Sequence, residues 1–170
     1  MAMDDRRNDV AAEIVRTAVA RGVSVRVLID GVGARYSRPS MVGEMRRRGI
    51  RVAEFLPSPV PFAHPYFNLR NHRKLLVIDG RIGYTGGMNV RDSCLLRRNP
   101  SKPTRDVHFK VTGPVVRQLS EAFAFDWRFT TSEVLSGDEW FPPTELAGDV
   151  LARGIATGPD ETNDALMLVL

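Results

Sequence analysis

The segment NHRKLLVIDGRIGYTGGMNV, residues 71–90, carries near its two ends residues with the chemistry of a phosphate-binding site. His72 is a natural nucleophile, or general acid and base, near neutral pH. Lys74 provides a positive charge with three hydrogen-bond donors, and Asn89 adds neutral N–H donors. Gly87 follows another glycine, and the pair leaves room for an oxyanion to approach the backbone. Together these residue types suit the binding and transfer of a phosphoryl group.

A turn at Asp79-Gly80 is expected to position these residues. Asp-Gly between two alternating apolar runs predicts a two-residue hairpin turn, because that turn requires positive φ angles, which glycine adopts at low cost. Directly opposed residues of a hairpin point to the same face of the sheet. The predicted pairs are Ile78 with Arg81, Lys74 with Thr85, and His72 with Gly87. The residues expected on one face, at the end away from the turn, are therefore His72, Lys74, Thr85, Gly87 and Asn89.

The imidazole of His72 needs a hydrogen-bond partner to orient it. Asp79 is seven residues away, which at ~3.3 Å per residue is roughly 20 Å along a strand, so its expected role is to shape the turn. Asp106, at the start of the next predicted strand, is the better placed carboxylate. The alternative is that His72 and Lys74 cap an edge strand and the glycines form a bulge. That alternative explains either residue alone, but not the whole set on one face.

Helix and strand patterns alternate along the chain, which indicates an α/β layer architecture. Helices are predicted at residues 9–21, 38–48 and 114–127, and strands at 23–30, 50–55 and 106–113, in addition to the hairpin. Residues 150–161 are predicted to form a strand and a turn. Four prolines predict an irregular loop over residues 56–67. Residues 131–149 are acidic and mostly irregular, and residues 163–170 begin a further helix.

The composition excludes several classes of protein. A single cysteine, Cys94, permits no internal disulfide and argues against a cysteine-based metal site. No apolar run approaches the ~20 residues that cross a bilayer, and the N-terminus has no signal-peptide pattern. The net charge of +4 combines +12 over residues 1–120 with −8 over residues 121–170. The basic part is either a solvated, arginine-rich surface or a site for a polyanion, namely nucleic acid or acidic lipid.

The pattern His72-x-Lys74-x4-Asp79, followed by Gly-Gly-x-Asn89, resembles the HKD motif of the phospholipase D superfamily. The wider segments RNHRKLLVIDGRIGYTGGMNV and RDVHFKVTGPVVRQLSEAFAFDW are most similar to bacterial cardiolipin synthases. The resemblance covers roughly residues 9–165. It implies an α/β fold in which a mixed β-sheet is flanked by helices on both faces.

The resemblance also implies a phosphatidyl transfer that is independent of metals and needs no cofactor. His72 is then the nucleophile that forms a phosphohistidine intermediate, and Asp79 completes the catalytic motif. Asp106 takes the position of the carboxylate that hydrogen-bonds the nucleophilic imidazole. The residues implied to bind the substrate phosphate are Lys74, Gly87 and Asn89. In a cardiolipin synthase, phosphatidylglycerol is both donor and acceptor of the phosphatidyl group, and glycerol is released.

The chain departs from the family pattern, because the family builds one active site from two HKD motifs and this chain has one. His108-Phe109-Lys110 offers a second H-x-K, but position 115 is Val where the motif has Asp, so we interpret it as an ordinary strand. We therefore expect the N-terminal catalytic half of a longer enzyme, lacking part of the first strand. Residues 4–135 are the predicted HKD domain, and residues 136–170 are a linker and the beginning of a second half.

Three kinds of partner follow from this interpretation. Anionic phospholipid, specifically phosphatidylglycerol, is the expected substrate, and nucleic acid is the alternative. A second HKD half, or a second copy of the chain in a homodimer, is expected to complete the site. The expected location is the cytoplasm or the periphery of the bacterial inner membrane. The alternative functions are a phospholipase D-like phosphodiesterase or nuclease, and an inactive half-enzyme.

Overall fold

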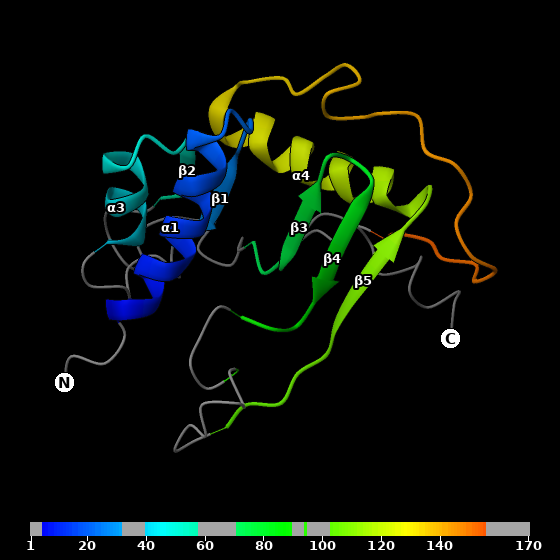
Figure 1. The fold of residues 1–170 in the computed structure, drawn as a ribbon, viewed down its shortest axis with the longest axis horizontal. Helices are drawn as coiled ribbons and strands as arrows, with labels where there is room; N and C mark the ends of the chain where they lie inside the picture. The colour runs from blue at the N-terminus through cyan, green and yellow to red at the C-terminus, as the bar shows by residue number, and fades with distance from the viewer. Residues whose placement is uncertain (1–4, 32–39, 58–70, 90–93, 95–102, 156–170) are drawn as a thin grey trace. The chain divides into compact units, whose positions relative to one another are not determined.

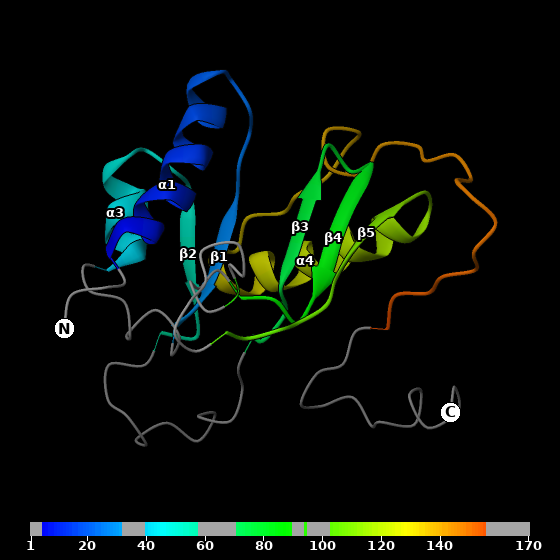
Figure 2. The ribbon, with the colours of Figure 1, turned by 60° about the horizontal axis from the view of Figure 1, so that its bottom comes forward.

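The computed structural model describes residues 5–31, 40–57, 71–89, 94 and 103–155 (Figures 1 and 2). The chain divides into two compact units. The first unit contains residues 1–73 and 87–107, and the second contains residues 74–86 and 108–170. Most of the proline-rich segment and the helix predicted at residues 163–170 lie outside the described residues.

The first unit contains two helices and a parallel pair of strands. In chain order these are α1 (Asp5–Ala20), β1 (Val27–Asp30), α3 (Met41–Arg47) and β2 (Val52–Phe55). Parallel strands require a crossover connection, and α3 lies within the connection from β1 to β2. The buried core residues are Ala12, Met45 and Ile50, against which Val15, Val19, Val27, Ile29, Met41 and Val52 pack.

Local signals in the sequence explain the limits of these two helices. The Ser40 hydroxyl accepts a hydrogen bond from the Gly43 N–H at 3.3 Å and caps the N-terminus of α3. Gly22 and Gly49 follow α1 and α3 with φ angles of 87° and 73°. Glycine adopts this left-handed conformation without the steric cost of a Cβ atom, so both helices end there. The two predicted helices are confirmed, with α1 beginning earlier than expected and α3 later.

An ion-pair network links α1 to α3. Arg48 Nη1 lies 3.1 Å from Glu13 Oε2 on α1, and Arg48 Nε lies 2.5 Å from Glu44 Oε1 on α3. Arg16 also donates a hydrogen bond to Glu13 at 2.9 Å. That hydrogen bond, together with the charges of Arg16 and Arg48, lowers the pKa of Glu13. Glu13 is therefore ionised at neutral pH and available to both arginines.

The second unit is a three-stranded antiparallel sheet with a helix on one face. The strands are β3 (Leu75–Ile78), β4 (Ile82–Gly86) and β5 (His108–Thr112), and the helix is α4 (Val115–Thr131). Gly83 on the central strand lies directly under α4, since a Cβ atom there would be 2.7 Å from Leu119 Cδ1. Val116 and Trp127 on the same helix are 0% and 3% exposed. The apolar stripe of α4 thus packs on the sheet.

The predicted α/β class is confirmed, with a parallel pair in the first unit and antiparallel pairs in the second. The strand predictions need correction at their ends. β1, β2 and β5 begin at Val27, Val52 and His108 rather than at residues 23, 50 and 106. The strand predicted within 150–161 is wrong for residues 150–155, which form no strand. Val150 and Leu151 are 82% and 100% exposed, and a strand needs a neighbour to satisfy its backbone groups. The domain limits at 4–135 and 136–170 stay predictions.

Candidate active site

The turn at Asp79-Gly80 is present, but the hairpin register differs by one residue from the prediction. Both residues adopt left-handed φ angles, 51° and 62°, and the Arg81 N–H donates to the Ile78 carbonyl at 3.0 Å. The ladder then pairs Ile78 with Ile82 rather than with Arg81. Arg81 is therefore an extra residue between the turn and β4, and the predicted pairs were wrong by that one residue.

The packing of Gly83 against α4 explains the observed register. Gly83 lies opposite Val77 on β3 and Val111 on β5, so these three residues share the face that α4 covers. A Cβ atom there would lie 2.7 Å from Leu119 Cδ1, so any larger residue would force the Leu119 side chain to shift. A shift of one residue would bring Leu76 beside Gly83 and turn Val77 away from the helix. The face that packs on α4 thus decides the register.

The corrected register separates Lys74 from Thr85. Thr85 lies opposite Leu75, and Lys74 precedes Leu75, so in regular alternation Lys74 points to the other face of the sheet. Continuing the ladder by one pair places Lys74 opposite Gly86. The expectation that strand pairing alone puts all five residues on one face is therefore wrong.

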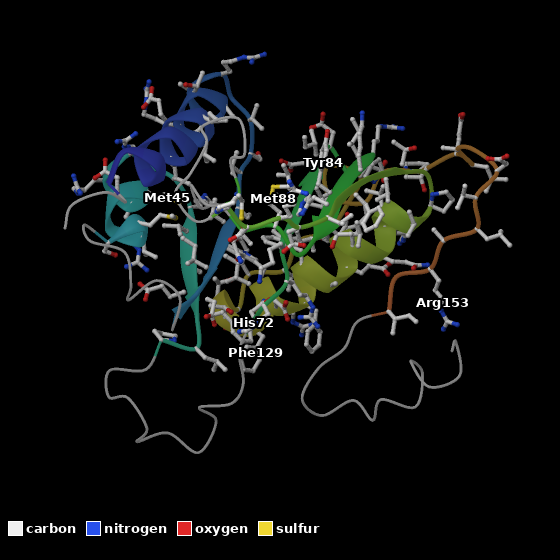
Figure 3. All side chains as sticks on the ribbon, turned by 90° about the horizontal axis from the view of Figure 1, so that it is seen from below. Met45, His72, Tyr84, Met88, Phe129 and Arg153 are labelled. Carbon is white, nitrogen blue, oxygen red and sulfur yellow. The ribbon has the colours of Figure 1, made fainter. Side chains whose placement is uncertain are left out.

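His72 lies just before β3, in a segment whose backbone is held by Asn71. The Asn71 side-chain oxygen accepts the N–H of Arg73 at 3.2 Å, which closes a small side-chain turn around His72. The His72 side chain is exposed, as a nucleophile must be to meet a substrate, and it is labelled in Figure 3.

Asp106 lies against Gly87 in the first unit. A Cβ atom on Gly87 would be 2.3 Å from Oδ1 and 2.6 Å from Oδ2 of Asp106, so the carboxylate occupies the space that a side chain would need. Two hydrogen bonds hold this arrangement. The Gly87 N–H donates to the Val107 carbonyl at 3.0 Å, and the Val107 N–H donates to Asp106 Oδ1 at 2.7 Å. A residue with a side chain at position 87 would displace the Asp106 carboxylate. The space beside Gly87 is filled by that carboxylate and is therefore not open to an oxyanion.

The predicted site residues are divided between the two units. His72, Gly87, Asn89 and Asp106 belong to the first unit, and Lys74 belongs to the second. Within the first unit the structure brings Asp106 to Gly87, and Asn89 is exposed two residues further along. The convergence of these groups with Lys74 around one phosphate stays a prediction.

The structure adds His108, which the sequence interpretation placed in an ordinary strand. That strand is confirmed as β5, and His108, its first residue, lies opposite Gly86. Its Nδ1 atom is buried, and in the part of the chain that the structure describes it has no hydrogen-bond partner. The spacing Asp106-x-His108 was the signal available in the sequence. Both residues lie at the beginning of the strand predicted at 106–113, so a role for one suggests a role for the other.

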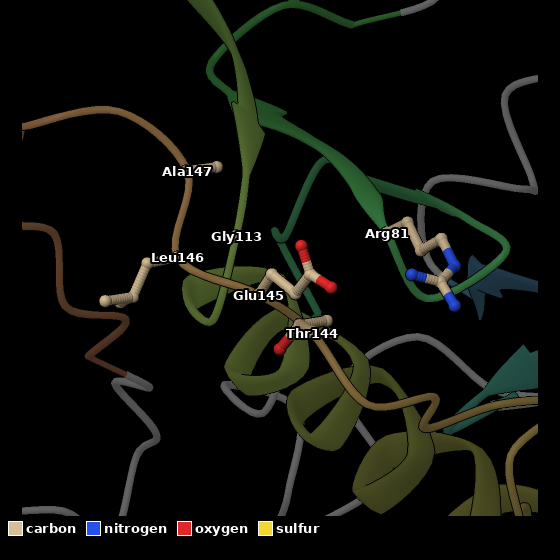
Figure 4. A pocket seen from close by; sticks show the side chains of 6 residues that line it. All are labelled: Arg81, Gly113, Thr144, Glu145, Leu146 and Ala147. Atoms are coloured by element: carbon tan, nitrogen blue, oxygen red, sulfur yellow. The ribbon is translucent and has the colours of Figure 1, made fainter.

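A pocket in the second unit lies toward the opposite end of the sheet (Figure 4). It is lined by Arg81, Gly113, Thr144, Glu145, Leu146 and Ala147. Arg81 is five residues from Gly86, or roughly 16 Å along an extended strand at ~3.3 Å per residue. The pocket contains no residue of the predicted site, and we assign it no part in the chemistry.

The left-handed conformation of Asp79 gives a test of its predicted role in the turn. Asparagine tolerates this conformation, whereas a β-branched residue does not. We expect Asp79→Asn to change the free energy of unfolding by less than about 0.5 kcal/mol and Asp79→Val to lower it by about 1–2 kcal/mol, as measured by urea denaturation. Asp79→Asn should also keep phosphoryl transfer to the protein. A folded Asp79→Asn variant without transfer would assign Asp79 to the chemistry.

A family model described as "Cardiolipin synthase, PLD-like domain" matches residues 2–127 of the chain. The match includes the hairpin, β5 and most of α4, and with them every predicted site residue.

Curated relatives agree with this match. The chain is 37% identical over 159 residues to the cardiolipin synthase of Alkalihalophilus pseudofirmus. The aligned residues make up 92% of this chain and 31% of that relative. It is 36% identical over 143 residues to the cardiolipin synthase of Staphylococcus aureus strain Mu50. Here the aligned residues make up 83% of this chain and 29% of that relative. The chain thus spans a little under a third of the length of these relatives.

Proposed function

We propose that this chain, which belongs to the family of cardiolipin synthase PLD-like domains, provides the HKD half of an active site for phosphatidyl transfer. The relatives named cardiolipin synthase support this class of reaction. The observation that carries the proposal is the Asp106 carboxylate, which lies against Gly87 and accepts the Val107 N–H. A carboxylate is thereby held at the glycine pair of the motif, and in this proposal it is the hydrogen-bond acceptor for the nucleophilic imidazole.

The first step of the proposed reaction forms the phosphohistidine. One imidazole nitrogen of His72 attacks the phosphorus of phosphatidylglycerol, and the bond from phosphorus to the headgroup oxygen breaks. Glycerol leaves with a proton from a general acid. Asp106 accepts a hydrogen bond from the other imidazole nitrogen, which keeps the attacking nitrogen unprotonated and stabilises the developing positive charge. Lys74 and Asn89 bind the phosphoryl oxygens.

The second step regenerates His72. A hydroxyl group of a second phosphatidylglycerol attacks phosphorus, the phosphorus–nitrogen bond breaks, and cardiolipin forms while the hydroxyl proton passes to a general base. The histidine of a second HKD motif is the group that we propose for both proton transfers. It comes from a second half of the protein or from a second copy of the chain.

The proposed substrate lies in a membrane, so the protein has to reach a lipid surface. Residues 1–120 carry a balance of +12, and basic residues attract anionic phospholipid. We therefore include peripheral binding at the bacterial inner membrane in the proposal. Separately, no helix among the described residues is long and apolar enough to span a bilayer.

The proposal is tested with vesicles of phosphatidylglycerol. We expect the chain to produce cardiolipin, detected by mass spectrometry, and one glycerol for each cardiolipin formed. If two copies share a site, the activity per chain rises with protein concentration, together with the mass measured by gel filtration. Absence of both cardiolipin and phosphatidic acid at every protein concentration would contradict an active site formed by two copies of this chain, and it would leave a site completed by a second half or an inactive half-enzyme.

The charge of residues 1–120 also supports a second candidate, a phosphodiesterase that acts on nucleic acid. The same constellation of imidazole, ammonium and amide groups would hold a nucleic-acid phosphodiester. Binding to DNA would then weaken steeply with salt, because each neutralised phosphate releases counterions. Strand cleavage that disappears in a His72→Asn variant, without cardiolipin formation, would favour this alternative.

A further inference from the structure

His108 has an unusual environment for a residue of a sheet strand. Its Nδ1 atom is buried and has no hydrogen-bond partner among the described residues, although the residue as a whole is half-buried. Lys110 and Thr112, which follow on the same face of β5, are exposed. Buried polar atoms in folded proteins nearly always have a partner, and each exception requires an explanation. If the imidazole had a structural role, we would expect a group of the protein to be the hydrogen-bond partner of Nδ1.

The strand pairing places His108 beside two elements of the HKD motif, all within the second unit. His108 lies opposite Gly86, and the ladder from Leu75 to Thr85, continued by one pair, places Lys74 on the other side of Gly86. The three residues thus form a row across three strands. Neighbouring strands are ~4.8 Å apart, so the backbones at Lys74 and His108 are roughly 10 Å apart.

The central position of this row has no side chain. Gly86 therefore places no side chain between Lys74 on β3 and His108 on β5. A phosphoryl group has oxygens on several sides, so it can accept hydrogen bonds from both neighbours at once. Gly83 faces α4, and Gly86, three residues further along β4, faces the other side of the sheet. The helix α4 therefore does not cover Gly86.

We propose that His108 is a substrate-binding residue whose Nδ1–H donates a hydrogen bond to an oxygen of a phosphoryl group held over Gly86 together with Lys74. The inference rests on the proposed function for the role of Lys74, and it extends that function by a residue outside the HKD motif. Because Nδ1 is buried in the free chain, the imidazole has to turn before it can meet the phosphoryl oxygen, which is then the partner that Nδ1 lacks among the described residues. No bond to His108 forms or breaks in this role.

The test uses inorganic phosphate as the probe and the complete chain. Titration with phosphate is followed by the ¹⁵N resonances of the His108 side chain. We expect phosphate to shift the Nδ1 resonance. We expect His108→Phe to weaken phosphate binding by about tenfold or more, since hydrogen bonds to charged groups are among the stronger ones. Lys110→Gln, two residues along the same face, is the matched control and should change the affinity less than about twofold.

Two amide variants separate a role for Nδ1 from a general role for a polar group. Asparagine places its amide near the position of Nδ1, and glutamine places it near Nε2. We expect His108→Asn to bind phosphate within about threefold of the wild type and His108→Gln to bind as weakly as His108→Phe. Equal affinities for the Asn and Gln variants would overturn the proposal, even if the Phe variant does not fold.

Thermal unfolding adds a readout that a structural role would move in the opposite direction. Replacing an unpaired buried nitrogen by an apolar ring removes a desolvation cost, so the midpoint of His108→Phe should stay the same or rise. A lower midpoint with unchanged phosphate affinity would make His108 a structural residue. Phosphate binding that depends on His108 in a chain that forms no cardiolipin would refute the proposed function and keep this inference. If His108→Phe forms cardiolipin with the KM of the wild type, the proposed function is kept and the role of His108 is refuted.

Discussion

Replacing His72 with asparagine should abolish the covalent labelling of the chain by phosphatidylglycerol that carries ³²P. The amide nitrogen of asparagine is not nucleophilic, so no phosphorus–nitrogen bond forms, and turnover should fall by several orders of magnitude. His72 is exposed and precedes β3, so the fold should be unaffected. The label is measured after an alkaline quench, because phosphohistidine survives base and is lost in acid.

The other histidines provide the control for this experiment. The chain has three, at positions 64, 72 and 108, and His64→Asn should keep the label. Mass spectrometry of the wild type should place the phosphoryl group on His72 alone. Label on the His72→Asn variant at the wild-type level would assign the nucleophile elsewhere. A wild type without label would contradict the proposed first step.

Replacing Gly87 with alanine should have the second largest effect. The new methyl group would lie 2.3 Å from Oδ1, 2.6 Å from Oδ2 and 2.7 Å from Cγ of Asp106, so the carboxylate has to move. It would then lose the Val107 N–H, now 2.7 Å from Oδ1, and with it the proposed hydrogen bond to the imidazole of His72. We expect the rate of label formation to fall about 10²-fold, and the free energy of unfolding to fall by about 1–3 kcal/mol, measured by urea denaturation.

Two variants isolate the cause of this effect. Gly43→Ala is the matched control, because its Cβ atom would meet nothing closer than Ser40 Cβ at 3.7 Å. Alanine inside helix α3 should raise the stability by up to about 1 kcal/mol and leave labelling unchanged. In an Asp106→Asn background, Gly87→Ala should reduce the rate much less than in the wild type, since both changes act on one interaction. Additive losses would show that Gly87 acts independently of Asp106.

At the hairpin, the local sequence determines the turn but not the pairing of the two strands. Asp79-Gly80 predicts a turn, and both residues adopt the left-handed conformation. The same dipeptide does not determine whether Ile78 pairs with Arg81 or with Ile82. The choice depends on Leu119, which lies thirty-six residues beyond Gly83 in the chain and occupies the space above it.

In the candidate site, too, some features follow from the local sequence and others depend on packing against distant residues. Asp106 was expected to act with the motif because a carboxylate is needed and its strand comes next. Its contact with Gly87 was not expected, since the glycine pair suggested open space. His108 was interpreted as an ordinary strand residue, and its buried, unpaired nitrogen depends on the neighbours that folding brings to it.

The sequence by itself determined the family, the α/β class, the ends of α1 and α3 at Gly22 and Gly49, and the turn at Asp79-Gly80. These features follow from the backbone preferences of a few adjacent residues and from a motif with fixed spacing. Only the tertiary structure decided the hairpin register and the placement of Asp106 and His108 beside the glycine pair. A shift of one residue in a strand costs little locally, yet it exchanges the two faces of the sheet. Packing against distant residues is what distinguishes the two registers.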